Sequence, residues 1–319
     1  MSLIHSIKKK LSQYKLITSI YALSHIGDIR RTLHYKHNLR LEQNDYPIAV
    51  MKYYKKSFGK PLNLDNPKTF DEKVMWLNLY DANPLKTQLA DKYAVRKWVS
   101  EKIGEEYLIP ILGVWDSFDE IDFDSLPNQF VLKANHGSSW NIIVKDKSNF
   151  DVAEAKQKFN HWMNLNYGFL EIIQLQYINI PPRIIAEKYL ENNNGELSDY
   201  KFHCFNGTPK YIQYMTGREN HDTLCEKIFD LNWGELPFVQ NYPKYPENVP
   251  CPQTLNRMTE LVQNLSEDFP YVRVDLYSLD DGSIKFGEMT FTPGFGNWNP
   301  SEYIDICGDY ITLPKEKKT

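Results

Sequence analysis

The strongest constraint on the fold is the dipeptide Asn206-Gly207, which stands between two β-rich runs. Asn-Gly favours the left-handed backbone angles of a two-residue hairpin turn, so residues 200–205 and 210–215 are predicted to pair as antiparallel strands. A second hairpin is predicted around Asp280-Asp281-Gly282, with strands over residues 271–278 and 283–291. Two hairpins in the second half of the chain indicate an antiparallel sheet there.

Helical patterns alternate with further strand patterns elsewhere. A capping box of Thr69 and Glu72 opens the first predicted helix, and a second helix is predicted over residues 89–103, ending at Gly104. The other predicted helices cover residues 152–165 and 253–267, and the other predicted strands cover residues 107–114, 129–134, 140–144 and 183–190. This alternation predicts an α+β fold and not a parallel, doubly wound sheet.

Several functional classes are excluded by the sequence of this 319-residue chain. Its net charge of -4 gives no global field that attracts nucleic acid, and no apolar run is long enough to cross a membrane. Neither GxGxxG nor GxxxxGK[ST] occurs, which removes the dinucleotide fingerprint and the P-loop. We expect no secretory signal, and we expect the four cysteines, which form no CxxC pair, to be reduced thiols in the cytoplasm.

The first forty residues are strongly basic. Their only acid is Asp28, whereas their basic residues are Lys8, Lys9, Lys10, Lys15, Arg30, Arg31, Lys36 and Arg40. Apolar residues recur among them at roughly helical spacing. A basic surface helix packed on the domain is expected, and the alternative is a helix that lies on an anionic membrane.

A lysine at the end of a predicted strand, followed by a loop with glycine and serines, is the first candidate site. Lys133 lies near the end of an apolar strand, and residues 135–139 read Asn-His-Gly-Ser-Ser. Backbone N–H groups and hydroxyls in such a mobile loop can cradle phosphate oxygens. The alternative is an ordinary hairpin with one exposed lysine.

The second candidate site is the hairpin that carries Arg273, Asp275 and Glu288. Strand alternation puts Arg273 and Asp275 on one face, and Glu288 faces Asp275 from the partner strand if the register allows it. Two carboxylates on one face suit Mg²⁺ with nucleotide phosphates completing its shell, and an arginine beside them suits a developing oxyanion. The alternative is a surface hairpin with a salt bridge.

Taken in order, six segments resemble the ATP-grasp superfamily, in particular its TupA-like branch, which is typified by teichuronopeptide biosynthesis. The segments are Asp91-Lys92, FVLKANHGSS from residue 130, IIAEKYL from 184, DYKFHCFNG from 199, RVDLY from 273 and FGEMTFTPG from 286. The likeness covers about residues 66–308, and its specificity lies in the ordered set and not in one motif. The resemblance implies an ATP-grasp fold in which two α+β subdomains clasp ATP.

The resemblance implies nucleotide contacts at the matching positions. Lys92 and Lys133 match the two lysines that contact ATP phosphates. The phosphate-covering loop is His136, Gly137, Ser138 and Ser139, and the adenine hinge is Glu187, Lys188, Tyr189 and Leu190. Asp199 matches the ribose-binding acid. A solvent-facing polar role is the alternative for His136.

The resemblance also implies a metal and reaction site. Asp275 and Glu288 match carboxylates that bind magnesium, and Thr290 stands where many ATP-grasp ligases have asparagine. Arg273 matches the arginine that stabilises the acyl phosphate and its tetrahedral successor. Lys201 and Arg218 are further candidates for contact with the γ-phosphate or the carboxylate substrate.

The implied protein is a cytoplasmic, ATP- and Mg²⁺-dependent ligase of cell-surface polysaccharide biosynthesis that joins an amino acid or amino sugar to a uronic-acid-type carboxylate. Three segments are predicted: a basic helical segment over residues 1–65, a small subdomain with the phosphate loop over 66–190, and a metal-binding subdomain over 191–319. The expected partners are the two substrates, with no nucleic acid. Residues 1–40 are the candidate contact with the inner membrane face or a polysaccharide assembly complex.

Two other functions compete with this interpretation. A glycosyltransferase is the first, because Asp122-Phe123-Asp124 has the form of a DxD metal motif, although a solvated acidic turn is the favoured explanation of these residues. A nucleotide-binding regulatory protein with an inactive site is the second. The presence of both lysines and both carboxylates argues against it.

Overall fold

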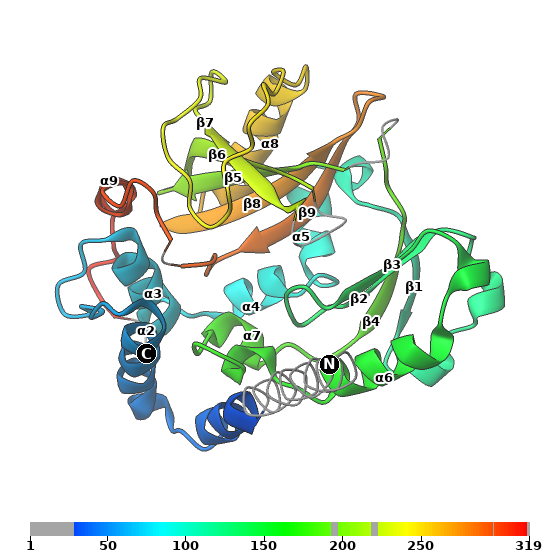
Figure 1. Ribbon diagram of the computed structural model, residues 1–319, viewed down its shortest axis with the longest axis horizontal. Helices are drawn as coiled ribbons and strands as arrows, with labels where there is room; N and C mark the ends of the chain where they lie inside the picture. Colours follow the sequence, from blue (N-terminus) through cyan, green and yellow to red (C-terminus); the bar gives the residue numbers. More distant parts are fainter. Residues whose placement is uncertain (1–28, 193–196, 218–222, 296, 318–319) are drawn as a thin grey trace, which may run out of the picture.

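Two antiparallel sheets form the frame of the molecule (Figure 1). The computed structural model describes residues 29–192, 197–217, 223–295 and 297–317. The first sheet has the strand order β1-β4-β2-β3, and the second has the order β7-β6-β5-β8-β9. The predicted α+β class is confirmed.

The strands follow the predicted hairpins closely. The first sheet contains β1 (Ile111–Trp115), β2 (Phe130–Ala134), β3 (Asn141–Val144) and β4 (Ile184–Lys188). The second contains β5 (Asp199–Phe205), β6 (Thr208–Thr216), β7 (Cys225–Phe229), β8 (Tyr271–Ser278) and β9 (Ile284–Thr290). Asn206 and Gly207 both have positive φ, at 48° and 75°, so the predicted turn between β5 and β6 is confirmed.

One face of the second sheet is an apolar core. Helices α8 (Leu255–Ser266) and α5 (Val95–Lys102) contribute to it, and Val272, Val274 and Leu276 of β8 point into it. Because successive strand residues alternate between faces, the residues between these three point the other way. The opposite face therefore carries Arg273 and Asp275.

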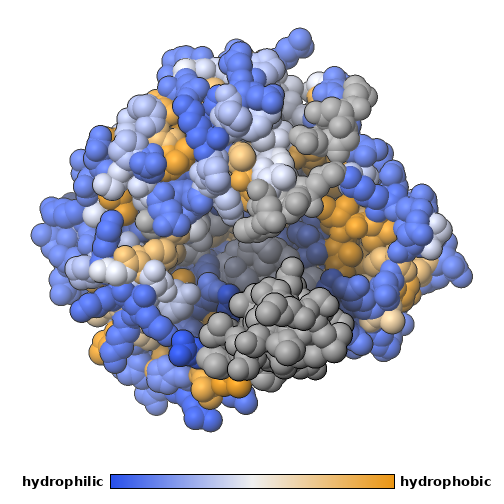
Figure 2. Space-filling view, viewed as in Figure 1, coloured by the Kyte–Doolittle hydropathy of each residue, from blue (hydrophilic) through white to orange (hydrophobic). Residues whose placement is uncertain are grey.

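The first sheet is built in the same way. Helix α6 (Val152–Met163) packs Ala155 and Phe159 against Phe130 and Leu132 of β2. The intervening residues Val131 and Lys133 lie on the other face of this sheet. Figure 2 shows that this side of the molecule is hollowed between the two sheets, with apolar side chains gathered over the first sheet at the edge of the hollow.

A third core joins the N-terminal helices to the end of the chain. Helices α2 (Tyr46–Phe58) and α3 (Phe70–Tyr80) pack here with α9 (Tyr303–Asp309). Thr69 accepts a hydrogen bond from the Glu72 N–H and the Glu72 carboxylate accepts one from Thr69 N, so the predicted capping box is confirmed. Short helices complete the structure: α4 (Pro84–Ala90), α7 (Leu175–Ile178), and the 3-10 turns η1 (Gln43–Asp45), η2 (Glu105–Tyr107), η3 (Phe118–Glu120), η4 (Phe123–Ser125), η5 (Lys147–Asn149) and η6 (Tyr167–Phe169).

The single helix predicted over residues 89–103 is wrong, because the chain breaks between α4 and α5. Asp91 adopts an extended backbone conformation, and its Oδ1 accepts hydrogen bonds from Tyr93 N at 2.8 Å and Ala94 N at 3.2 Å. An aspartate that binds the backbone ahead of it competes with the helix. Lys92 therefore lies in the turn between α4 and α5 and not within a helix. The strand predicted from residue 107 is also shorter, because η2 precedes β1.

The predicted three-segment division stays a prediction. The core around α3 contains Phe70, Ile173, Phe205 and Tyr271, and so draws on both sides of the proposed boundary at residue 190. Residues 1–28 of the basic N-terminal segment lie outside the described residues, and residues 29–38 are helical. In the ranges that the structure covers, no helix has the length and apolar character needed to span a membrane.

Asp71→Asn is expected to stabilise the protein at neutral pH. Asp71 is fully buried, and Tyr54 donates a hydrogen bond to its Oδ2 at 2.6 Å. Burial raises the pKa of this carboxyl to about 6, whereas its ordinary value is 3.8. A raised pKa means that the folded state holds the proton more tightly, so stability falls as pH rises from about 4 to about 6 and stays low above that.

The Asn variant removes this cost, so its free energy of unfolding should exceed that of the unaltered protein by up to about 3 kcal/mol at pH 7.5. The difference should close near pH 4. Urea unfolding at several pH values measures it. A difference that does not change with pH would contradict the explanation.

Candidate functional site

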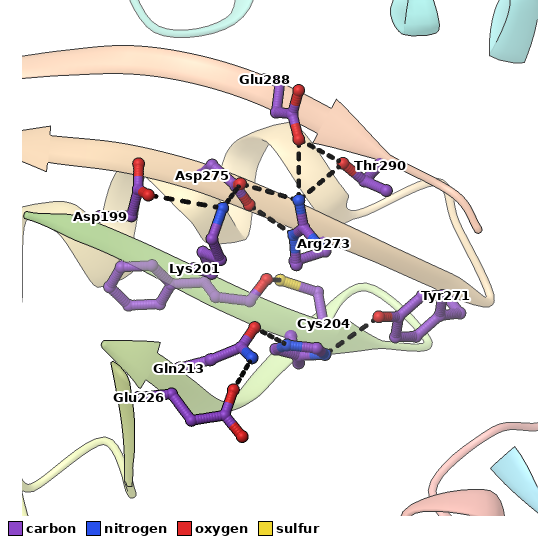
Figure 3. Close-up of polar contacts among 12 residues, drawn as sticks. Asp199, Lys201, Cys204, Gln213, Glu226, Tyr271, Arg273, Asp275, Glu288 and Thr290 are labelled. Carbon is purple, nitrogen blue, oxygen red and sulfur yellow. Dashed lines mark hydrogen bonds and ion pairs between the residues drawn. The ribbon is translucent and has the colours of Figure 1, made fainter. Parts of the chain in front are cut away.

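Charged residues and one threonine from three neighbouring strands meet on one face of the second sheet (Figure 3). They are Asp199 and Lys201 on β5, Arg273 and Asp275 on β8, and Glu288 and Thr290 on β9. The register places Asp275 between Lys201 and Glu288, and Arg273 opposite Thr290. The predicted facing of Asp275 and Glu288 is therefore confirmed.

A β-bulge at Gly287 makes this arrangement. Near the turn, Leu276 pairs with Phe286, but the next residue of β8, Asp275, pairs with Glu288, so Gly287 is the extra residue. If Gly287 were paired in a regular ladder instead of bulged, Glu288 would lie opposite Val274 and face the apolar core. A Cβ on Gly287 would approach the Asp275 carbonyl oxygen to 3.0 Å, which explains the glycine. A glycine inside a strand is the signal in the sequence that indicates such a bulge.

Arg273 bridges the two carboxylates. Its Nε lies 2.7 Å from Asp275 Oδ1, and its Nη2 lies 2.8 Å from both Asp275 Oδ2 and Glu288 Oε1. The Thr290 hydroxyl accepts a hydrogen bond from Arg273 Nη2 at 3.1 Å and donates to Glu288 Oε1 at 3.0 Å. Lys201 forms an ion pair with Asp275 as well and lies 3.7 Å from Asp199 Oδ2. The carboxylates are thus held by cations from this chain.

These cations keep Glu288 ionised. Burial alone would raise the pKa of Glu288, but the positive charges of Lys92, Arg273 and Lys201 outweigh burial and hold the pKa well below its usual range. Lys92 Nζ lies 3.9 Å from Glu288 Oε2. Burial lowers the pKa of Lys92, and Glu288 opposes that shift. A negative Glu288 at neutral pH is what a metal ligand requires.

The donor set fits a hard divalent cation that arrives with phosphates. The Arg273 guanidinium shows that one cation is held between Asp275 and Glu288, and carboxylate and hydroxyl oxygens are the ligands that Mg²⁺ prefers. Within the described ranges no group of three or more His, Cys, Asp or Glu has the arrangement of a metal site. Magnesium would therefore be held by Asp275 and Glu288, with Thr290 beside them, and would need further oxygens from its ligand.

The first sheet presents a second charged group toward the hollow. Lys133 of β2 forms an ion pair with Glu187 of β4, and Arg96 Nη1 of α5 lies 3.8 Å from Glu187 Oε1. Ile143 of β3, opposite Val131, is 54% exposed. A cation flanked by apolar side chains suits a nucleotide, whose base is apolar on its faces and whose phosphates are anionic.

The loop over residues 135–139 is anchored, which differs from the expected mobile loop. Lys92 Nζ donates to the Gly137 carbonyl at 2.6 Å. His136 is buried and not solvent-facing: Asn135 Oδ1 is 3.3 Å from its Nδ1 and the Trp162 carbonyl is 3.2 Å from its Nε2. Burial lowers its pKa, so the ring is neutral and holds the loop. Ser139 has a positive φ of 60°.

Asn135 and Asp91 join the two lysine-bearing segments, a role that no pattern in the sequence indicates for either residue. The Asn135 amide Nδ2 donates to Asp91 Oδ1 at 2.9 Å and to the Pro181 carbonyl at 3.0 Å, and its Oδ1 accepts from Arg183 N at 2.6 Å. Lys92 N donates to the Asn135 carbonyl at 3.2 Å. The fully buried amide thus fixes Lys92 relative to the loop.

Asn135→Asp is expected to weaken nucleotide binding about 10-fold and to lower the free energy of unfolding by about 2 kcal/mol, because a donor becomes a second carboxylate beside Asp91. Isothermal titration with ADP and urea unfolding measure the two effects. The exchange Asp91→Asn/Asn135→Asp restores a donor–acceptor pair and should recover part of both losses. Equal losses in the single and exchanged variants would contradict the pairing.

The remaining predicted positions lie around these groups. At the end of β4 Lys188 is exposed and Tyr189 and Leu190 are half-buried, whereas Asp199 is buried. Arg218 lies outside the described residues. Asp122 and Asp124 of the alternative metal motif are exposed in η4, where Asp122 Oδ1 accepts a hydrogen bond from Asp124 N at 3.1 Å. That motif is a self-capped acidic turn.

Comparison with known proteins places these features in a family context. A family model described as TupA-like ATPgrasp matches residues 72–312. The search of curated proteins finds no significant match. Similar solved structures include N5-carboxyaminoimidazole synthetase from Staphylococcus aureus complexed with ADP, at 13% identity and a TM-score of 0.41, covering 71% of this chain and 53% of that one.

Two further solved structures are similar at the same level. D-alanine–D-alanine ligase from Bacillus anthracis complexed with ATP has 15% identity and a TM-score of 0.38, covering 65% of this chain and 56% of that one. L-amino acid ligase from Bacillus licheniformis has 15% identity and a TM-score of 0.41, covering 69% of this chain and 47% of that one. The chain spans about half the length of these structures.

Proposed function

Because the chain belongs to the TupA-like ATP-grasp family and has its α+β fold, we propose that it is an ADP-forming ligase that joins a carboxylate to an amine. The observation that carries the proposal is the charged face of the second sheet. Arg273 bridges Asp275 and Glu288 there, and Lys92 reaches the same Glu288 while its Nζ binds the loop at Gly137. A phosphate-binding lysine and loop beside a metal-binding carboxylate pair suit phosphoryl transfer from ATP.

The reaction proceeds in two steps. A carboxylate oxygen of the first substrate attacks the γ-phosphorus of ATP, the bond to the β-phosphate oxygen breaks, and ADP leaves. The amine nitrogen of the second substrate then attacks the acyl carbon, phosphate leaves, and the nitrogen loses its proton to solvent. No covalent bond to the protein forms, so no nucleophilic Ser or Cys is required.

Each residue of the site has a proposed role in binding or catalysis. Lys92, Lys133 and the backbone of residues 136–139 bind the phosphates, and Asp275 and Glu288 hold the divalent cation. When bound, that cation offsets negative charge on the phosphates. Arg273 stabilises the oxyanion that forms when the amine attacks. Glu187, Lys188, Tyr189 and Leu190 bind adenine, Asp199 binds ribose, and Lys201 and Arg218 contact the γ-phosphate or the carboxylate.

The proposed substrates follow from the family. We propose a uronic-acid-type carboxylate and an amino acid or amino sugar, within cell-surface polysaccharide assembly. The test is ADP release by the purified protein with ATP and Mg²⁺ against a panel of uronic acids crossed with amino acids and amino sugars. ADP that forms only when an acid and an amine are both present supports the proposal.

The other outcomes of the same panel decide against it. Consumption of nucleotide-sugars without ADP release would favour the glycosyltransferase. Binding of ATP with no turnover for any pair would favour a regulatory protein. The self-capped turn at Asp122 and Asp124 gives the glycosyltransferase no support.

We also propose that residues 1–40 rest on an anionic membrane face, which would bring the ligase to its polymer. Ile29 and Leu33 stand one helical turn apart and are 51% and 61% exposed, with Lys36 and Arg40 nearby. Co-sedimentation with vesicles containing phosphatidylglycerol should fall for Ile29→Glu/Leu33→Glu and at high salt. Equal sedimentation of the variant and the unaltered protein would remove this proposal.

A further inference from the structure

Tyr177 of α7 lies where the three parts of the site converge. Its side chain is 7% exposed and packs with Ala90, Ile180 and Tyr167, and the rings of Tyr167 and Tyr177 are 4.8 Å apart. Ala90 is the last residue of α4 and directly precedes Asp91-Lys92. The ring of Tyr177 therefore contacts the helix that leads into the phosphate-binding lysine.

The neighbours of Tyr177 connect it to the other two parts. Tyr167 lies near Ser138 of the phosphate loop, whose side chain opposes the rise that burial causes in the Tyr167 pKa. Gln176, the preceding residue, donates from Nε2 to Thr292 Oγ1 at 2.6 Å, two residues beyond Thr290. Thr292 in turn donates to Gln174 Oε1, so both sides of its hydroxyl are used. Helix α7 is thus fixed between the loop and the end of the strand that carries Glu288.

The hydroxyl of Tyr177 has no hydrogen-bond partner within the described part of the chain, although it is surrounded by charge. Burial raises its pKa well above the ordinary value, and the groups that act on it include Glu288, Arg273 and Asp275. The phenol is therefore protonated at neutral pH and is a donor. Tyr211 and Tyr271, buried on the same sheet face, both contact His203 Nδ1, at 3.1 and 3.0 Å. Tyr177, in contrast, has a hydroxyl that can donate to a ligand that supplies the acceptor.

We propose that the Tyr177 hydroxyl donates a hydrogen bond to an anionic oxygen of the reacting group. That oxygen belongs either to the phosphoryl group or to the carboxylate that receives it. The inference rests on the proposed ligase function and adds a catalytic residue to it. A donor fixed beside the Arg273 cluster stabilises charge in the reacting group without needing to reorganise.

The test compares Tyr177→Phe with the unaltered protein, because this change removes one oxygen and keeps the packing of the ring. We expect kcat for ADP formation to fall by about 10- to 100-fold, the range for loss of one positioned donor, with the melting temperature unchanged. Tyr310→Phe, on an exposed tyrosine beyond α9, is the matched control and should retain full activity.

Affinity for nucleotide distinguishes the two oxygens. A higher dissociation constant for ATP but not for ADP assigns the contact to the γ-phosphoryl group. Unchanged ATP affinity with a lower kcat or a higher KM for the carboxylate assigns it to the carboxylate. Unchanged kcat, KM and ATP affinity overturn the proposal.

Failure of the proposed function would be seen separately, in the unaltered protein. If no acid–amine pair releases ADP, the ligase assignment fails, and Tyr177 is then judged by ATP affinity alone. Equal ATP dissociation constants for the unaltered protein and Tyr177→Phe would overturn the proposal in that case, and weaker binding by the variant would support it.

Discussion

Asp275→Asn is expected to lower the rate of ADP formation by about three orders of magnitude or more. Asp275 is buried. It accepts two hydrogen bonds from Arg273 and forms an ion pair with Lys201. The amide replaces one of the two carboxylates proposed to hold the divalent cation. Loss of a single neutral hydrogen-bond donor in an active site typically lowers the rate by about 10²–10³. Loss of a charged metal ligand is expected to lower the rate further.

The same change removes one carboxylate partner from each of two buried cations, Arg273 and Lys201. Removing one member of a buried ion pair costs about 3–5 kcal/mol, so the variant should also melt at a lower temperature. Activity is therefore measured well below that temperature, with folding checked by circular dichroism. Asp268→Asn, on an exposed carboxylate just before β8, is the matched control. A folded Asp275→Asn protein with normal turnover would refute the assignment of the metal site.

Arg273→Lys is expected to lower kcat by about 100-fold while changing ATP affinity only a few-fold. The guanidinium reaches Asp275, Glu288 and Thr290 together because its nitrogens are spread in a plane. Lysine keeps the charge but has a single point of contact, so it cannot hold both carboxylates and still meet an oxyanion.

Two comparisons make this result specific. Arg257→Lys, on an exposed arginine of α8 that contacts Tyr107 and Glu260, should leave kcat unchanged. Separate measurement of kcat and of the ATP dissociation constant distinguishes loss of transition-state stabilisation from loss of nucleotide binding. A change confined to ATP affinity would assign Arg273 to nucleotide binding instead.

The parts of the fold set by local chemistry were predictable. The capping box at Thr69 and the turn at Asn206-Gly207 depend on residues within a few positions, and both are present as predicted. The carboxylate pair on β8 and β9 was predictable up to register. Register depended on the bulge at Gly287, which strand alternation alone does not reveal.

Long-range contacts were not predictable in the same way. The break before Lys92 depends on Asp91, whose partner Asn135 is 44 residues away. The approach of α7 to the site depends on a hydrogen bond from Gln176 to Thr292, 116 residues apart. Periodicity reports which face of an element is apolar but not which distant side chain meets it, so Tyr177 passed unnoticed.

The extra residue in β9 has a consequence for how this protein can change over time. Pairing on the turn side of Gly287 and pairing on the carboxylate side follow two different registers, separated by the bulge. Lengthening or shortening the hairpin tip at residues 279–283 can be absorbed on the turn side, and the reactive side chains keep their orientation. Removal of Gly287 alone would join the two registers into one regular ladder, in which Leu276 still pairs with Phe286 and Asp275 with Glu288. The pairing of Asp275 with Glu288 is therefore set at the bulge and not by the length of the hairpin tip.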